Sequence, residues 1–204
     1  TTLLRALSQR HSEVKADIGL SRMQKIPFFL RNTYSLLPTY LVQYRDSRWF
    51  NWRESRSMTY LEAGLHVLGR QKVQNGSVTF LDHGPIYRLA FLREFGPEII
   101  TSQAYKRWWA KLHRQWIVTL DMVIWLDAAD AVLLERIRAR DQRHTIKEQS
   151  EPEACEVLSR YRRAFEQTIA DSGADQQLVL LRFDTEQASV EQIAGDVLAI
   201  LGGT

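Results

Sequence analysis

The most regular pattern in the chain is a short apolar run that passes directly into a helical repeat, between residues 121 and 143. Met122 to Leu126 is apolar, β-branched and aromatic over the length of a strand, and Asp127 closes it. After a polar turn, in which Asp130 is suited to an N-cap, apolar residues recur with the period of a helix. The pattern predicts a buried strand that leads into a helix.

Similar strand-length runs lie at residues 77–81 and 177–183, and helical spacing comes after each of them; Ser189 is suited to cap the closing helix. Strands that alternate with helices indicate a parallel sheet. The sequence therefore predicts an α/β fold with three layers, a parallel sheet with helices on both faces. With 204 residues, 45% of them hydrophobic, the chain can bury one core, so we expect a single domain over residues 1–204.

Three arginines distinguish the helix that comes after the strand at 122–126. Arg136, Arg140 and Arg143 recur at spacings of four and three, so they project from one side of the helix and from the turn after it. Guanidinium groups stay charged and bind phosphate oxygens through paired hydrogen bonds. The row favours a polyphosphate ligand.

A carboxylate comes directly after the strand predicted at 77–81, within the sequence LDHGP. Asp82 would emerge at the carboxyl edge of the sheet, where ligands bind and where a carboxylate can hold magnesium. His83 and a glycine-proline break come next. An aspartate at a strand end is also a common structural cap, so Asp82 could cap the turn after the strand and not bind a ligand.

Two stretches before that strand have more than one explanation. Residues 26–45 are rich in aromatic and leucine side chains, which are typical of core or of a pocket for a flat ligand. Pro27 suits a helix start, and Pro38 is expected to interrupt or kink the helix. The stretch RWFNWRESR at 48–56 is either a solvated turn or a substrate rim. In the second case Arg53 and Arg56 would hold an anionic group and Glu54 would receive a hydroxyl.

Composition narrows the class of protein. The net charge of +3 is too small to argue for nucleic acid, because 24 acidic residues are interspersed with 27 basic ones. The single cysteine excludes an intramolecular disulfide and a cysteine-based metal cluster. No apolar run reaches membrane-spanning length, and the first residues have no signal-peptide pattern. We expect a cytoplasmic protein without membrane partners.

Together these segments resemble the P-loop kinases of nucleosides and nucleoside monophosphates, the thymidylate kinase-like group. LLERIRAR with DQR is similar to the lid of that family, SVTFLDHGP to the strand beside the phosphoryl acceptor, and RFDTEQASVEQI to its closing segment. The resemblance implies a P-loop NTPase kinase-like fold and a nucleotide-binding transferase that uses ATP and Mg²⁺. Its small-molecule acceptor would be a nucleoside or nucleoside monophosphate. The acceptor side would be a helical region at about 26–72, and the lid would lie at about 136–150. The resemblance leaves undecided whether the protein forms a homodimer.

The resemblance also implies roles for single residues. Arg136 would lie against the adenine of ATP, and Arg140 and Arg143 would reach the transferring phosphates as catalytic groups. Asp184 and Thr185 would border the adenine.

On the acceptor side, Asp82 would be catalytic and would hold magnesium. His83 stands where the family has an arginine, and it would bind the acceptor together with Arg53, Glu54 and Arg56.

The first residues, TTLLRAL, are similar to the helix that comes after Gly-Lys in a P-loop, although no G-x-x-x-x-G-K-[ST] occurs in the chain. The resemblance implies that the first strand and the phosphate loop are missing, that Thr1 is the magnesium-binding hydroxyl, and that Thr2 lies beside it at the phosphates. The full-length form would be the active kinase, and this fragment would catalyse little. The alternative is a helix with a threonine N-cap.

Two other hypotheses remain. The acceptor could be a sugar, an antibiotic or adenylyl sulfate, or the transferred group could be sulfuryl. The chain could instead be a non-catalytic binding module that uses the face from Trp108 to Arg114 for RNA, although nucleic acid is disfavoured by the helical spacing of the apolar residues there.

Overall fold

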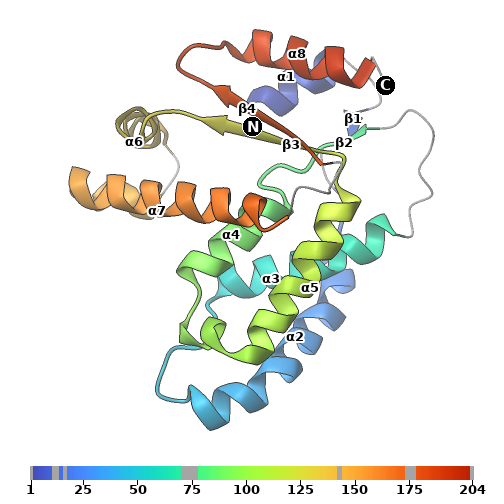
Figure 1. Cartoon of the computed structure of the whole chain (residues 1–204), viewed down its shortest axis with the longest axis vertical. Coiled ribbons are helices and arrows are strands. Elements are labelled where there is room, and N and C mark those ends of the chain that lie inside the picture. Colours follow the sequence, from blue (N-terminus) through green and yellow to red (C-terminus); the bar gives the residue numbers. More distant parts are fainter. Residues whose placement is uncertain are drawn as a thin grey trace.

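The computed structural model describes residues 2–10, 14–15, 18–69, 78–141, 144–172 and 178–202. Figure 1 shows a predominantly helical molecule. The α-helices in these residues are α1 (Thr2–Arg10), α2 (Arg22–Gln43), α3 (Trp52–Leu68), α4 (Pro85–Phe95), α5 (Gln103–Thr119), α6 (Asp130–Ala139), α7 (Glu151–Ala170) and α8 (Val190–Gly202). The 3-10 helices are η1 (Glu98–Thr101) and η2 (Thr145–Glu148), and the strands are β1 (Val14–Lys15), β2 (Val78–Thr79), β3 (Met122–Asp127) and β4 (Val179–Asp184).

The predicted three-layer parallel sheet is wrong. Among the described residues the strands form two separate parallel pairs, β1 with β2 and β3 with β4. The first pair joins only two residues of each strand, whereas β3 and β4 are in register from Met122 opposite Val179 to Asp127 opposite Asp184. β2 and β3 both line a cavity and do not pair with each other. Periodicity identifies extended segments, but it does not determine that they share one sheet.

The β3–β4 pair is covered on both faces. Ile124 and Leu181 pack with the buried side chains of α1 and α8, and Val123 packs with residues of α4, α5 and α7. Figure 1 shows α1 and α8 above the pair and α7 below it. The expectation of a buried strand holds only in part, because Val123 is the fully buried residue of β3 while β4 buries none of its side chains completely.

The largest core lies among α2, α3, α4 and α5, away from the strands. Trp116 of α5 is completely buried there, and its indole Nε1 donates to the carbonyl of Leu61 at 3.0 Å. The expected interruption of α2 at Pro38 is wrong, and so is the expected helix start at Pro27, because α2 begins at Arg22 with Ser21 as its N-cap. The helix continues through both Pro27 and Pro38 to Gln43, because tertiary packing can override local preference.

Helix starts agree with the sequence more closely. Asn51 and Glu54 form a capping box at the start of α3. Ser189 caps α8 as predicted, since its hydroxyl accepts the backbone N–H of Gln192 at 3.2 Å. Within the part of the chain that the structure describes, none of the helices combines the length and apolar character needed to cross a bilayer.

Candidate functional site

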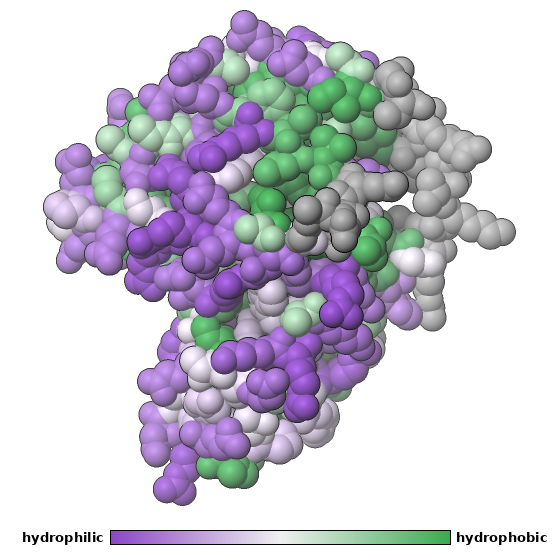
Figure 2. Space-filling view, viewed as in Figure 1, coloured by the Kyte–Doolittle hydropathy of each residue, from purple (hydrophilic) through white to green (hydrophobic). Residues whose placement is uncertain are grey.

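A cavity of about 2150 Å³ lies between the two strand pairs. Its walls come from α1, α3, the segment after β2, β3, α6, α7 and the turn after β4. Figure 2 shows apolar surface gathered over the part of the molecule where β3, β4 and α1 lie, with hydrophilic residues around it. The predicted site residues that line this cavity are Thr2, Arg53, Glu54, Asp82, His83, Arg136, Arg140 and Thr185.

The other predicted site residues are placed differently. Arg56 and Asp184 do not line the cavity. The carboxylate of Asp184 instead accepts the backbone N–H of Glu186 at 2.9 Å, which fixes the turn after β4. Thr1 and Arg143 lie outside the described residues.

The predicted site residues Arg136 and Thr185 contact each other on the wall of the cavity. Arg136 donates to the Thr185 hydroxyl at 2.7 Å and to the Thr185 carbonyl at 3.0 Å. The same hydroxyl donates to the carbonyl of Asp127 at 2.9 Å. These bonds tie α6 to the ends of β3 and β4, so two residues 49 positions apart form one side of the site.

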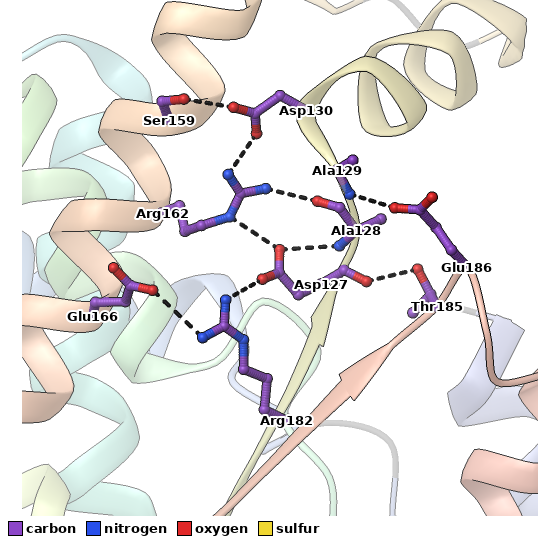
Figure 3. Close-up of polar contacts among 10 residues, drawn as sticks. All are labelled: Asp127, Ala128, Ala129, Asp130, Ser159, Arg162, Glu166, Arg182, Thr185 and Glu186. Atoms are coloured by element: carbon purple, nitrogen blue, oxygen red, sulfur yellow. Dashed lines mark hydrogen bonds and ion pairs between the residues drawn. The ribbon is translucent and has the colours of Figure 1, made fainter.

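The Asp127 carboxylate at the end of β3 is fully engaged (Figure 3). It accepts from Arg162 at 3.2 Å, from Arg182 at 2.6 Å and from the N–H of Ala128 at 3.0 Å. Burial alone would raise the pKa of Asp127, but the bonds and charges of Arg182 and Arg162 outweigh it, and the pKa lies below its ordinary value. Asp127 is therefore a structural anion and not a carboxylate that is open to a metal.

Carboxylates of the protein itself also occupy the start of α6 (Figure 3). Asp130, which was expected as the N-cap, is the first residue of the helix, and its carboxylate lies 2.7 Å from Arg162 of α7. The carboxylate of Glu186 accepts the N–H of Ala129, the N-cap residue, at 2.6 Å. A protein carboxylate thus fills the position that an anionic ligand could take at this helix end.

Arg53 of α3 also lines the cavity. Its guanidinium lies over the ring of Phe91 with 4.4 Å between the Cζ atom and the ring centre, and it donates to the hydroxyl of Tyr87 at 3.3 Å. Tyr87 in turn stacks on Tyr161 with 4.9 Å between ring centres. Aromatic contacts hold this guanidinium in place without neutralising its charge.

Asp82 and His83 lie beside Tyr87 on the turn after β2. The imidazole of His83 packs edge-on against Tyr87, with Nδ1 at 3.4 Å from the Asp82 carboxylate. His83 has a φ of 47°, in the left-handed region that non-glycine residues seldom occupy. Such backbone strain is concentrated at functional sites, and it presents the two side chains at the cavity.

Two more positively charged or titratable groups line the cavity from the segment after α6. Arg140 comes after the last residue of α6, and His144 precedes η2; both line the cavity. Burial lowers the pKa of His144, and the positive charges of Arg53, Arg140 and Lys147 lower it further. In the described part of the chain no ion pair engages the guanidinium of Arg53 or Arg140. These cations therefore converge on a region where an anion would relieve their repulsion.

Glu54 does not have the geometry of a hydroxyl-binding group. Its side chain is only 1% exposed, and its carboxylate accepts two hydrogen bonds from Arg48, at 2.7 and 2.8 Å, and one from the N–H of Asn51. The predicted substrate rim thus divides into two parts. Arg53 lines the cavity, and Glu54 and Arg48 fix the start of α3.

Sequence patterns missed His144, Tyr87 and Tyr161. His144 comes directly after the arginine-rich segment, so its position in the chain was a usable signal. The two tyrosines lie on separate helices, α4 and α7, and carry no motif that would join them.

Two predicted site residues that line the cavity are carboxylates: Glu54 is bound to Arg48, and Asp82 lies 3.4 Å from the imidazole of His83. Magnesium bound to nucleotides commonly uses one or two protein carboxylates and phosphate oxygens, which Asp82 fits. No cluster of three or more metal-ligating side chains occurs in the described ranges. The chain matches no protein-family model, no curated protein and no solved structure.

Proposed function

We propose that this protein binds ATP and a small acceptor in the cavity and transfers the γ-phosphoryl group to the acceptor, a nucleoside or nucleoside monophosphate. One observation carries the proposal. Arg53 of α3, Arg136 of α6 and Arg140 after α6 line the same cavity as Asp82, although the sequence separates them by up to 87 positions. Phosphoryl transfer depends mainly on positioning and on neutralising phosphate charge, and these groups supply both.

The size of the cavity supports a reaction with two substrates. Pockets for one small ligand usually measure about 300–1,000 Å³, and this cavity is about 2150 Å³. Two groups of lining residues differ chemically. Arg136 and Thr185 form a polar edge suited to a base, and Arg53, Tyr87 and His144 form a cationic and aromatic group suited to an acceptor.

Each residue then has a distinct task. Arg140 would bind the phosphates, and Arg53 would bind the acceptor. Asp82 would hold magnesium or orient an acceptor hydroxyl; magnesium, when bound, would neutralise charge on the nucleotide phosphates. Because Glu54 is committed to Arg48, the site favours a monophosphate over a neutral nucleoside as the acceptor.

Calorimetric titration of the chain with MgATP tests the proposal. Arg140→Ala should weaken binding about tenfold or more, because a charged hydrogen bond contributes about 1.5–3 kcal/mol. Arg107→Ala is the matched control, since Arg107 is an exposed arginine of α5 that does not line the cavity.

Transfer of labelled γ-phosphate is then measured against a panel of nucleosides, nucleoside monophosphates and sugars. We expect labelled product with a monophosphate and its loss in Asp82→Asn. Equal binding of MgATP by the wild type and Arg140→Ala would reject the proposed site. Transfer that both variants leave unchanged would reject the mechanism.

A further inference from the structure

Helix α2 exposes an apolar stripe to solvent. The residues of this stripe, which we call the outer stripe, are Met23, Ile26, Leu30, Tyr34, Leu37 and Leu41. They follow one another at spacings of three, four, four, three and four, which places them on one face of the helix. Five of these side chains are between 46% and 75% exposed, and Leu37 is half-buried. The stripe contains no charged residue, and none of its members lines the cavity.

The opposite face of α2 makes the contacts with the rest of the molecule. Its buried residues are Asn32 and Leu36, and Asn32 accepts a hydrogen bond from the indole of Trp108 at 3.1 Å. Arg31 reaches Glu62 of α3 at 2.7 Å. A surface helix normally turns its apolar side inward. Here the inner face buries Leu36 together with the polar Asn32, and a second apolar stripe lies outside, which marks the outer stripe as an interaction surface.

We propose that the outer stripe is the interface of a homodimer, in which α2 packs antiparallel against α2 of a second copy. The spacing of the stripe is nearly symmetric about position 32. An antiparallel two-fold arrangement therefore places Leu30 against Tyr34 of the second copy, and Met23 against its Leu41. Such self-matching is what a two-fold interface requires, and an unrelated partner would not impose it.

The charges at the helix ends support the same orientation. The first turn of α2 has no acidic residue and the last turn has no basic one. Arg22 and Lys25 instead lie at the end where the helix dipole is positive, which is unfavourable for an isolated helix. Antiparallel pairing brings these cations beside the negative C-terminal end of the dipole of the other α2; Asp46 at that end already lies 3.8 Å from Arg45, so the support comes from the helix dipole alone.

The length of the stripe sets the strength of the dimer. A helix of 22 residues is about 33 Å long, and a strip about 11 Å wide along it covers about 360 Å² in projection. Stable interfaces usually bury about 800 Å² on each partner. The α2 pair alone falls below that value, so we expect a dimer that exchanges with monomer at micromolar concentrations.

Sedimentation velocity of the whole chain from about 1 to 200 µM tests the dimer. The wild type should shift from monomer to dimer across this range, and Leu30→Glu should weaken dimerisation about 100-fold, because the interface would bury two acidic side chains near its centre. Val42→Glu is the control, since Val42 is 79% exposed on the same helix but lies about 100° around it from the stripe. Circular dichroism verifies that both variants are folded.

Cysteine cross-linking tests the orientation, in a Cys155→Ser background that removes the native thiol. A mixture of Leu30→Cys and Tyr34→Cys chains should form mixed disulfides faster than either chain links to itself. The proposal is overturned if the wild type stays monomeric at 200 µM, if the two glutamate variants weaken association equally, or if like chains cross-link fastest. Binding of the wild type to phosphatidylcholine vesicles that Leu30→Glu abolishes would assign the stripe to lipid and would also overturn it.

Discussion

Replacement of Asp127 by asparagine should destabilise the protein, because it removes the central anion of the network in Figure 3. The side chain of Asp127 is 14% exposed and joins Arg162, which is 24% exposed, to Arg182, which is 49% exposed. Asparagine has nearly the same shape and keeps one acceptor, so the substitution tests charge and not packing.

The remaining partners limit the loss. Arg162 keeps Asp130 at 2.7 Å, and Arg182 keeps Glu166 at 3.5 Å. The charged bond to the half-buried Arg162 is worth about 1.5–3 kcal/mol, and the bond to the half-exposed Arg182 at most about 1 kcal/mol. We therefore expect a loss of about 2–3 kcal/mol in the free energy of unfolding, or about 5–10 °C in Tm for a chain of this size.

The loss should depend on pH. Since the pKa of Asp127 is lower in the folded chain than its ordinary value of 3.8, its stabilising contribution is present above that value and disappears as the pH falls through the folded-state pKa. Urea unfolding followed by circular dichroism should show the full difference between wild type and Asp127→Asn at pH 7. The difference should shrink below about pH 4.

The control is Asp196→Asn, at an exposed position of α8, which should change stability by less than about 0.5 kcal/mol. A loss below that level in Asp127→Asn at pH 7 would show that the network is not stabilising. An equal loss at pH 3 and pH 7 would show that its effect is not electrostatic.

Two further predictions concern the site and the core. Sulfate does not titrate near neutral pH, and it should bind more tightly as the pH falls from 8 to 5.5, by up to about tenfold for each unit by which it raises the pKa of His144. His144→Gln should reduce the pH dependence of the calorimetric affinity, and an unchanged slope would exclude this histidine. Gly96→Ala should cost about 1–3 kcal/mol in thermal unfolding, because its Cβ would meet Ile100 Cγ2 at 2.5 Å and the Leu92 carbonyl oxygen at 2.6 Å. A Cβ at Gly195 of α8 would meet no atom within 4 Å, so Gly195→Ala should stabilise the chain by about 0.5–1 kcal/mol. Equal effects of the two substitutions would contradict a steric clash as the cause of the loss in Gly96→Ala.

Local spacing in the sequence predicted the elements that depend on near neighbours. The apolar run ending at Asp127 is strand β3, the run at 177–183 overlaps β4, and Ser189 caps α8. These features rest on continuous apolar runs of strand length and on bonds between residues three apart, both of which can be counted along the chain. The acidic and basic candidates around the cavity were also visible, because charge and spacing identify residues suited to phosphate.

Only the tertiary structure decided which of the charged groups are already engaged by other parts of the chain. Asp127 and Glu54 are strand-end and helix-start carboxylates, and arginines bind both of them. The division into two strand pairs and the outward-facing stripe of α2 also depend on packing between distant segments. The sequence by itself determines which side chains the chain carries and their local period. Pairing, burial and ion partners are settled by residues tens of positions apart, whose meeting depends on the free energy of the whole fold.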